Sequence, residues 1–170
     1  MKKAVVVVVK ALMFDFKKNY FQLFELPISF NVDEALLKKH YLIILQQIHP
    51  DRFVNATEQE KRLAVQYTGY VNEAFATLRE TTKRAAYLLK IQGVEINFET
   101  NTVMDEDFLI EQLQWREKMA NATEAQFTQI KEELNVEKKK IIKGLEESFF
   151  DKDLEKARKL TLKLKFYDKF

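Results

Sequence analysis

The sequence has 170 residues, of which 46% are hydrophobic and 32% charged, with only 3 glycines and 2 prolines. This composition suits one or two compact helical domains and excludes an intrinsically disordered chain. The formal net charge is +2, so composition gives no general attraction to nucleic acid or to an anionic membrane. The absence of cysteine excludes disulfides and thiolate ligation of zinc or of an iron–sulfur cluster. His40 and His49 are too few for a histidine-rich metal site, and we expect neither a metal nor another cofactor.

Residues 1–18 are expected to form a poorly ordered amino-terminal extension. Lys10 interrupts the apolar run from Ala4 to Val9, which is therefore shorter than the roughly 7 to 15 apolar residues of a secretory signal. We therefore expect a protein that is not secreted. Met13 is a second plausible start of translation, because it directly precedes the first predicted domain.

An aromatic-rich helical turn is predicted from Asn19 onward, and Pro27 ends it. Asn31 or Asp33 can then cap the next helix, in which Glu34 lies in the first turn, where the helix dipole favours a carboxylate. Apolar residues recur in this helix at spacings of four, three and four, which predicts one buried stripe. They are Leu37, Tyr41, Ile44 and Ile48.

A His-Pro-Asp tripeptide ends this helix, because Pro50 disfavours the helical conformation of His49. His49, Asp51 and Arg52 are therefore expected at a loop tip between two helices, where their side chains can meet a partner. A tripeptide alone is a modest signal, and the flanking patterns must support it.

A capping box, Thr57 with Glu60, starts the second long helix. We expect this helix to pack antiparallel on the previous one. Thr81 or Thr82 then begins a shorter helix that Gly93 closes. Residues 19–92 are thus predicted to form one helical domain. Its core positions in the second long helix are Ala64, Tyr67, Thr68, Val71, Phe75 and Leu78.

Residues 93–104 lack helical periodicity and are predicted to be a connector. Residues 105–170 are predicted to form a three-helix bundle, because three periodic segments follow one another with short links. The first runs from Asp105 to about Ala120, Thr123 opens the second, and Asp151 or Asp153 opens the third. The fold class expected for the whole chain is all-α.

The first bundle helix carries two separate apolar stripes. At about 100° per residue, Phe108, Trp115 and Met119 cluster on one face, which we expect in the core. In the last helix Phe166 is predicted to project almost opposite the buried arc. One helix cannot bury two separated stripes against the same neighbours, so the spare stripe must face the other domain or a partner. That stripe is Leu109, Ile110 and Leu113, bordered by Arg116 and Glu117.

Two helices around an exposed His-Pro-Asp resemble the J domain, and the chain from Asn19 onward resembles the HscB family of J-domain co-chaperones of iron–sulfur cluster assembly. The resemblance covers both predicted domains in the family's order, which makes it far more specific than the tripeptide. The segments that carry it are residues 20–27, 49–53, 71–79, 84–89, 108–113, 115–117 and 163–169.

The resemblance implies two protein partners, an HscA-type DnaK-like chaperone and an IscU-type iron–sulfur scaffold protein, and no nucleic acid or membrane. It also implies the bacterial cytoplasm rather than an organellar matrix. The chaperone-binding residues, which would stimulate its ATPase, are then His49, Pro50, Asp51, Arg52, Lys38 and Lys39. The scaffold-binding residues are then Leu109, Ile110, Leu113, Arg116, Glu117 and Phe166.

This sequence departs from the family's pattern in two places. Basic residues usually occupy the outer face of the helix before His-Pro-Asp, and here that face carries Leu42, Ile43, Gln46 and Gln47. Weaker or less salt-sensitive docking, or docking to one dedicated chaperone, would follow. Gln114 stands where relatives often carry a carboxylate.

Two alternative functions differ from this one. A general J-domain co-chaperone of DnaK would serve unfolded clients through an unspecific apolar surface. An enzyme using His49 and Asp51 as an acid–base pair would need a nucleophile, a glycine-rich loop or a metal constellation beside them, and the sequence offers none. We therefore expect a protein that binds and regulates, and does not catalyse.

Overall fold

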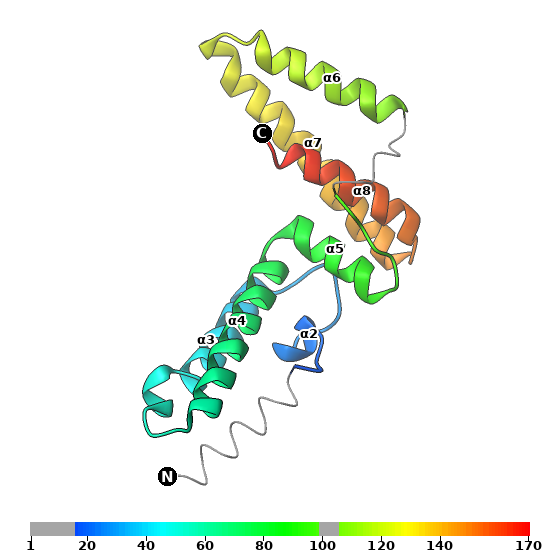
Figure 1. The fold of residues 1–170 in the computed structure, drawn as a ribbon. Helices are drawn as coiled ribbons and strands as arrows, with labels where there is room; N and C mark the ends of the chain where they lie inside the picture. Colours follow the sequence, from blue (N-terminus) through cyan, green and yellow to red (C-terminus); the bar gives the residue numbers. More distant parts are fainter. Residues whose placement is uncertain (1–15, 99–105) are drawn as a thin grey trace. The chain divides into compact units, whose positions relative to one another are not determined.

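The computed structural model describes residues 16–98 and 106–170, and the regular structure there is entirely helical (Figure 1). The all-α fold class expected from the sequence is thereby confirmed. The expected extension up to residue 15 and the connector from residue 99 lie outside the described residues. The helices are α2 (Tyr20–Leu23), α3 (Glu34–Gln47), the 3-10 turn η1 (Pro50–Phe53), α4 (Glu58–Arg79), α5 (Thr81–Ile91), α6 (Glu106–Ala120), α7 (Glu124–Phe150) and α8 (Leu154–Tyr167).

The chain divides into two compact units between Arg84 and Ala85, a point that lies within α5. The domain ranges expected from the sequence place the boundary after this helix, and they stay a prediction. In the two described ranges, no helix combines the length and apolarity that a membrane crossing needs.

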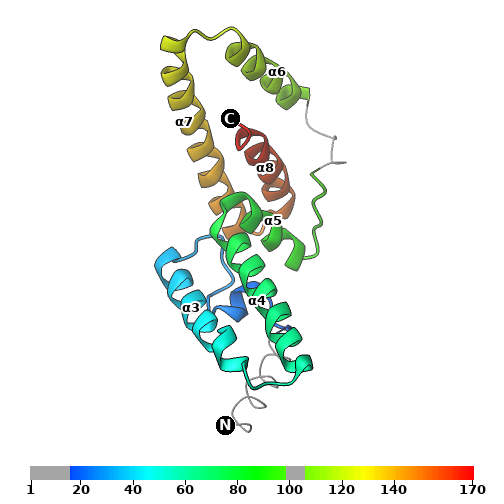
Figure 2. The same cartoon turned by 60° about the vertical axis from the view of Figure 1, so that its left-hand side comes forward.

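The first unit is built on a hairpin of α3 and α4, which lie side by side with η1 between them (Figures 1 and 2). Six of the ten predicted core positions are buried, while Tyr41, Ile44, Thr68 and Phe75 are only half-buried. Tyr41 and Phe75 stack on each other with ring centroids 4.0 Å apart. The buried residues along the hairpin are Leu37, Ile48, Ala64, Tyr67, Val71, Ala74 and Leu78.

The helix starts in this unit are set by local hydrogen bonds. Asp33, rather than Asn31, caps α3, and its carboxylate accepts the Leu36 N–H at 2.9 Å. The predicted capping box of α4 is confirmed, because the Thr57 N–H donates to Glu60 at 2.7 Å and the Glu60 N–H donates to the Thr57 hydroxyl at 3.3 Å.

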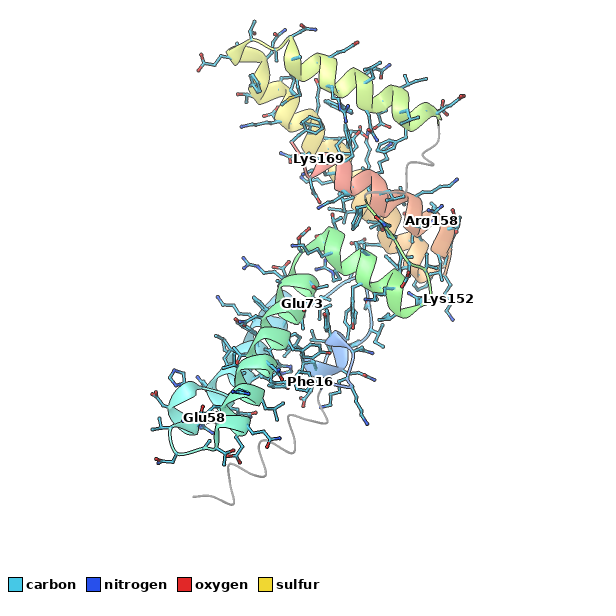
Figure 3. All side chains as sticks on the ribbon, viewed as in Figure 1. Phe16, Glu58, Glu73, Lys152, Arg158 and Lys169 are labelled. Carbon is cyan, nitrogen blue, oxygen red and sulfur yellow. The ribbon has the colours of Figure 1, made fainter. Side chains whose placement is uncertain are left out.

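Aromatic contacts hold the segment around α2 against α4. The rings of Phe16 and Tyr67 lie 5.4 Å apart, those of Tyr20 and Tyr70 lie 5.5 Å apart, and the Tyr70 hydroxyl donates to the Lys18 carbonyl at 2.7 Å (Figure 3 labels Phe16). The hairpin is thus supported from one side by the residues that precede it.

Arg84 is a buried cation at the end of the first unit. Its side chain is 7% exposed, and its guanidinium donates to the carbonyl of Phe30 at 2.8 Å and to that of Leu78. Burial lowers the pKa of Arg84, and the charge of Glu34 opposes that change. The guanidinium of Arg84 therefore donates to the Leu78 carbonyl in the last turn of α4, where carbonyls have no partner within their own helix.

The second unit is built on α7 and α8, with Asp153 as the cap of α8. Gly144 allows close approach, since a Cβ there would come within 3.0 Å of Leu160. Buried hydroxyls are satisfied within their helices, as the Thr161 hydroxyl donates to the Ala157 carbonyl at 2.7 Å. The core of this pair includes Ile130, Leu134, Ile141, Leu145, Ala157 and Leu164.

A polar cluster joins α6 to α8 inside the second unit. Trp115, which is only partly buried, donates its indole N–H to the Tyr167 hydroxyl at 2.9 Å. That hydroxyl in turn donates to Glu111, whose other oxygen accepts from Lys163 at 2.6 Å. Burial raises the pKa of Tyr167, and the carboxylate of Glu111 beside it adds to the increase.

Replacing Arg84 by Met removes the donors to Phe30 and Leu78 while keeping an apolar stem of similar length. We expect the free energy of unfolding to fall by about 2 kcal/mol, because buried carbonyls would lose charged donors. Urea unfolding followed by circular dichroism measures this. Lys83→Met, which removes only an exposed pair with Glu80, should change the value by less than about 0.5 kcal/mol. Equal effects of the two substitutions would contradict the role of Arg84.

The raised pKa of Tyr167 means that folding favours its neutral form. This stabilisation is complete below the ordinary tyrosine pKa of about 10 and is lost as pH rises above it. In an ultraviolet titration to about pH 11, Tyr167→Phe should therefore develop as much tyrosinate absorbance as the unaltered protein, provided circular dichroism shows both folded. A loss of about one sixth of the signal, the share of one among 6 tyrosines, would show that Tyr167 titrates normally.

Candidate functional site

The tip of the α3–α4 hairpin is the first part of the candidate site. Helix α3 ends at Gln47, and the Ile48 N–H still donates to the Ile44 carbonyl at 3.1 Å. His49 has an extended backbone, with φ −56° and ψ 136°, before Pro50 begins η1. The predicted end of the helix ahead of the proline is confirmed, and its cause is the restricted backbone of the residue that precedes proline.

His49 and Asp51 lie open to solvent at this tip. Their side chains are 61% and 87% exposed, and His49 Nδ1 lies 3.5 Å from the Asp51 carboxylate. The backbone N–H of Asp51 also points to His49 Nδ1, at 3.4 Å. The imidazole and the carboxylate are therefore held close together and remain accessible to another protein.

The other predicted chaperone-binding cations lie at different distances from this loop. Arg52 is exposed within η1, and Lys38 and Lys39 are exposed on α3. Lys39 precedes His49 by ten positions, most of them helical, which corresponds to roughly 15 Å along the helix axis. The intervening face carries large exposed apolar residues, Leu42 at 47% and Ile43 at 42%, and no cation. The structure thus brings Arg52 to the loop and places both lysines several turns away.

The hairpin tip also has an apolar pocket of about 460 Å³ that sequence reasoning missed. Its rim includes Val54 and Val65, which are 66% and 73% exposed. The helical periodicity does predict that Val65 is exposed, because this residue lies about 160° around α4 from the core residue Tyr67. The pocket is lined by Leu45, Ile48, His49, Phe53, Val54, Lys61, Ala64, Val65 and Thr68.

Helix α6 in the second unit has two faces of different chemistry. Phe108 and Trp115 lie on the face that contacts α8, where their rings approach Phe166 and Tyr167 with centroids 5.7 Å and 6.0 Å apart. On the other face the predicted spare stripe is exposed: Leu109 at 46%, Ile110 at 56% and Leu113 at 58%, with Arg116 and Glu117 also exposed.

The expected outward projection of Phe166 is wrong, because its side chain is only 4% exposed. Its ring packs edge-on against Phe108 and Phe170. Phe166 is buried because α8 contacts α7 along one stripe and α6 along another, so that both stripes are covered. Phe166 therefore lies beneath α6 and does not share the exposed stripe.

The structure also bears on metal binding. In residues 16–98 and 106–170, no three side chains of histidine, aspartate or glutamate come together in a group that could hold a metal ion. The exposed groups of His49 and Asp51 can offer hydrogen bonds and charge.

Comparison with known proteins relates this geometry to a family. Residues 104–170 match the family model described as the HSCB C-terminal oligomerisation domain. The crystal structure of human co-chaperone protein HscB is 32% identical, with a TM-score of 0.86 over 90% of this chain and 78% of that chain. Chaperone HscB from Vibrio cholerae is 33% identical, with a TM-score of 0.82 over 89% of this chain and 92% of that chain.

Two curated relatives extend the comparison. A co-chaperone protein HscB homolog from Cupriavidus taiwanensis is 45% identical over 108 residues, which are 64% of this chain and 61% of that protein, less than two thirds of its length. A homolog from Shewanella loihica is 37% identical over 163 residues, covering 89% of this chain and 92% of that protein. Because this second match spans both sequences almost completely, the chain belongs to the HscB co-chaperone family.

Proposed function

We propose that this chain stimulates ATP hydrolysis by an HscA-type DnaK-like chaperone and delivers an IscU-type scaffold protein to it during iron–sulfur cluster assembly and transfer. The observation that carries the proposal is the presence of two exposed surfaces on two separate compact units. One is the loop of His49 and Asp51, and the other is the apolar stripe Leu109, Ile110 and Leu113.

The loop suits a docking role because its shape is largely set before a partner arrives. Pro50 restricts the backbone of His49, and His49 Nδ1 accepts the Asp51 N–H at 3.4 Å, which limits rotation of the imidazole. A pre-ordered loop loses less conformational entropy on binding than a flexible one. The exposed Arg52 adds a cation beside the carboxylate of Asp51.

The stripe on α6 has the anatomy of a small protein interface. Three large apolar side chains lie in its middle, and the charged residues Arg116 and Glu117 border it. An apolar centre with a polar rim is typical of binding surfaces. The buried ring of Phe166 supports this helix from below, so its contribution to scaffold binding would come through the position of Phe108.

The proposed function depends on one chain holding the chaperone and the scaffold at the same time. A chain that holds both partners makes their encounter effectively intramolecular, with effective concentrations of about millimolar. The chain itself makes and breaks no covalent bond, in line with relatives that are named co-chaperones. The bacterial origin of these relatives favours the bacterial cytoplasm as the place of action.

His49→Gln should reduce the maximal stimulation of the chaperone's ATP turnover by about tenfold or more, since the imidazole is the central exposed group of the loop. Steady-state ATP hydrolysis, with and without scaffold, measures this. Asn55→Ala is the matched control, because Asn55 is exposed just beyond the same loop and should leave stimulation unchanged. Equal stimulation by His49→Gln and the unaltered protein would refute the assignment of the loop.

Leu109→Ala combined with Leu113→Ala should weaken binding of the scaffold by about 30-fold or more, as each leucine loses buried apolar area at the centre of the stripe. Calorimetric titration of the scaffold protein measures this. Leu42→Ala with Ile43→Ala, an exposed apolar pair on the other unit, is the control. Phe166 is left unaltered because it is buried. If the double substitution weakens capture of unfolded clients and leaves scaffold binding unaffected, the protein is a general co-chaperone.

A further inference from the structure

We propose that the chaperone docks on the hairpin by apolar contact, with an apolar segment of its surface entering the pocket beside His49. The docking surface consists of this pocket and the neighbouring residue Leu42 on α3. The inference rests on the proposed function, which assigns the loop to the chaperone, and it adds how the chaperone is held there.

Three parts of the chain form the walls of the pocket, which helps to keep it open in the free protein. The end of α3 contributes Leu45 and Ile48, η1 contributes Phe53, and the first turns of α4 contribute Ala64 and Thr68. Ile48, Phe53 and Ala64 are themselves buried and belong to the hairpin core. The floor is therefore part of the packed hairpin and not a gap between mobile side chains.

His49 joins this pocket to the loop. The imidazole both lines the pocket and contacts Asp51. Any protein surface that engages His49 must therefore also cover at least part of the pocket. Val54 and Val65 stand at the rim with most of their surface in water, and covering them removes apolar area that the free protein leaves exposed.

The two ends of the hairpin differ in how many charged side chains line their pockets. A second pocket of about 430 Å³, farther from the loop, includes Glu34, Lys38 and Arg79 in its lining. The pocket beside His49 has one cation in its lining, Lys61, which pairs with Glu58 at 3.0 Å. The part of the surface nearest the loop thus has little net charge with which to attract a charged partner.

The apolar character of α3 continues this surface. Leu42 contributes to the second pocket and Leu45 to the first, so consecutive turns of one helix link the two. Leu42 is 47% exposed. A complementary chaperone surface must therefore be apolar at the position next to the loop, because an unpaired charge would be desolvated against these side chains at a high cost.

The test measures ATP turnover of the chaperone against the concentration of this protein. Val65→Asp is expected to raise the concentration that gives half-maximal stimulation by about tenfold, through desolvation of the new carboxylate. Val136→Asp is the matched control, since Val136 is 50% exposed on α7 in the other unit and should have no effect. Circular dichroism verifies that both variants keep their helices.

Salt dependence is the second readout. Between about 50 and 500 mM salt, the half-maximal concentration for the unaltered protein should change less than about threefold, because apolar contact is not screened. A change of more than about tenfold, or equal behaviour of Val65→Asp and Val136→Asp, would overturn apolar docking. His49→Gln distinguishes a failure of apolar docking from a failure of the proposed function. If His49→Gln abolishes stimulation while Val65→Asp has no effect, the proposed function stands and only this inference fails.

Discussion

The packing of α3 against α4 is the interaction on which the exposed loop depends. Buried residues from both helices, such as Leu37 and Leu78, hold the two helices side by side over their length. The chain between them must then reverse direction within a few residues, and Pro50 makes this reversal begin at His49. His49 and Asp51 are exposed because the hairpin core is closed beneath them by Ile48 and Phe53. Residues that close the hairpin core and residues that are exposed at its tip are therefore neighbours in the sequence.

In the second unit, contacts of a different kind determine which side chains of α6 are exposed. Helix α6 is attached to α8 by aromatic contacts and by the hydrogen bonds of Glu111 with Tyr167 and Lys163. These contacts fix the rotation of α6 about its own axis. Since residues on a helix are distributed at about 100° intervals, fixing one face as the inner one leaves Leu109, Ile110 and Leu113 on the outer one. The polar cluster thus determines which side chains the bundle presents.

The two surfaces differ in their chemistry, so under the proposed function each would select its own partner. The hairpin tip combines a polar loop with an apolar pocket, whereas α6 presents an apolar stripe bordered by Arg116 and Glu117. They lie on units with separate cores. A substitution on one surface is therefore expected to leave the packing that supports the other intact.

The sequence by itself determined the features that depend on neighbouring residues along the chain. The cap at Thr57, the end of α3 before Pro50 and the positive φ of 86° at Gly93 all follow from local backbone and side-chain preferences, whereas the choice of Asp33 over Asn31 as the cap of α3 came from the structure. The outer stripe of α6 also followed from periodicity. Only the tertiary structure decided the burial of Phe166, the pairing of Tyr167 with Glu111 and the pocket beside His49. Each of these requires two or three helices to face one another at a particular rotation, which the periodicity of a single helix does not specify.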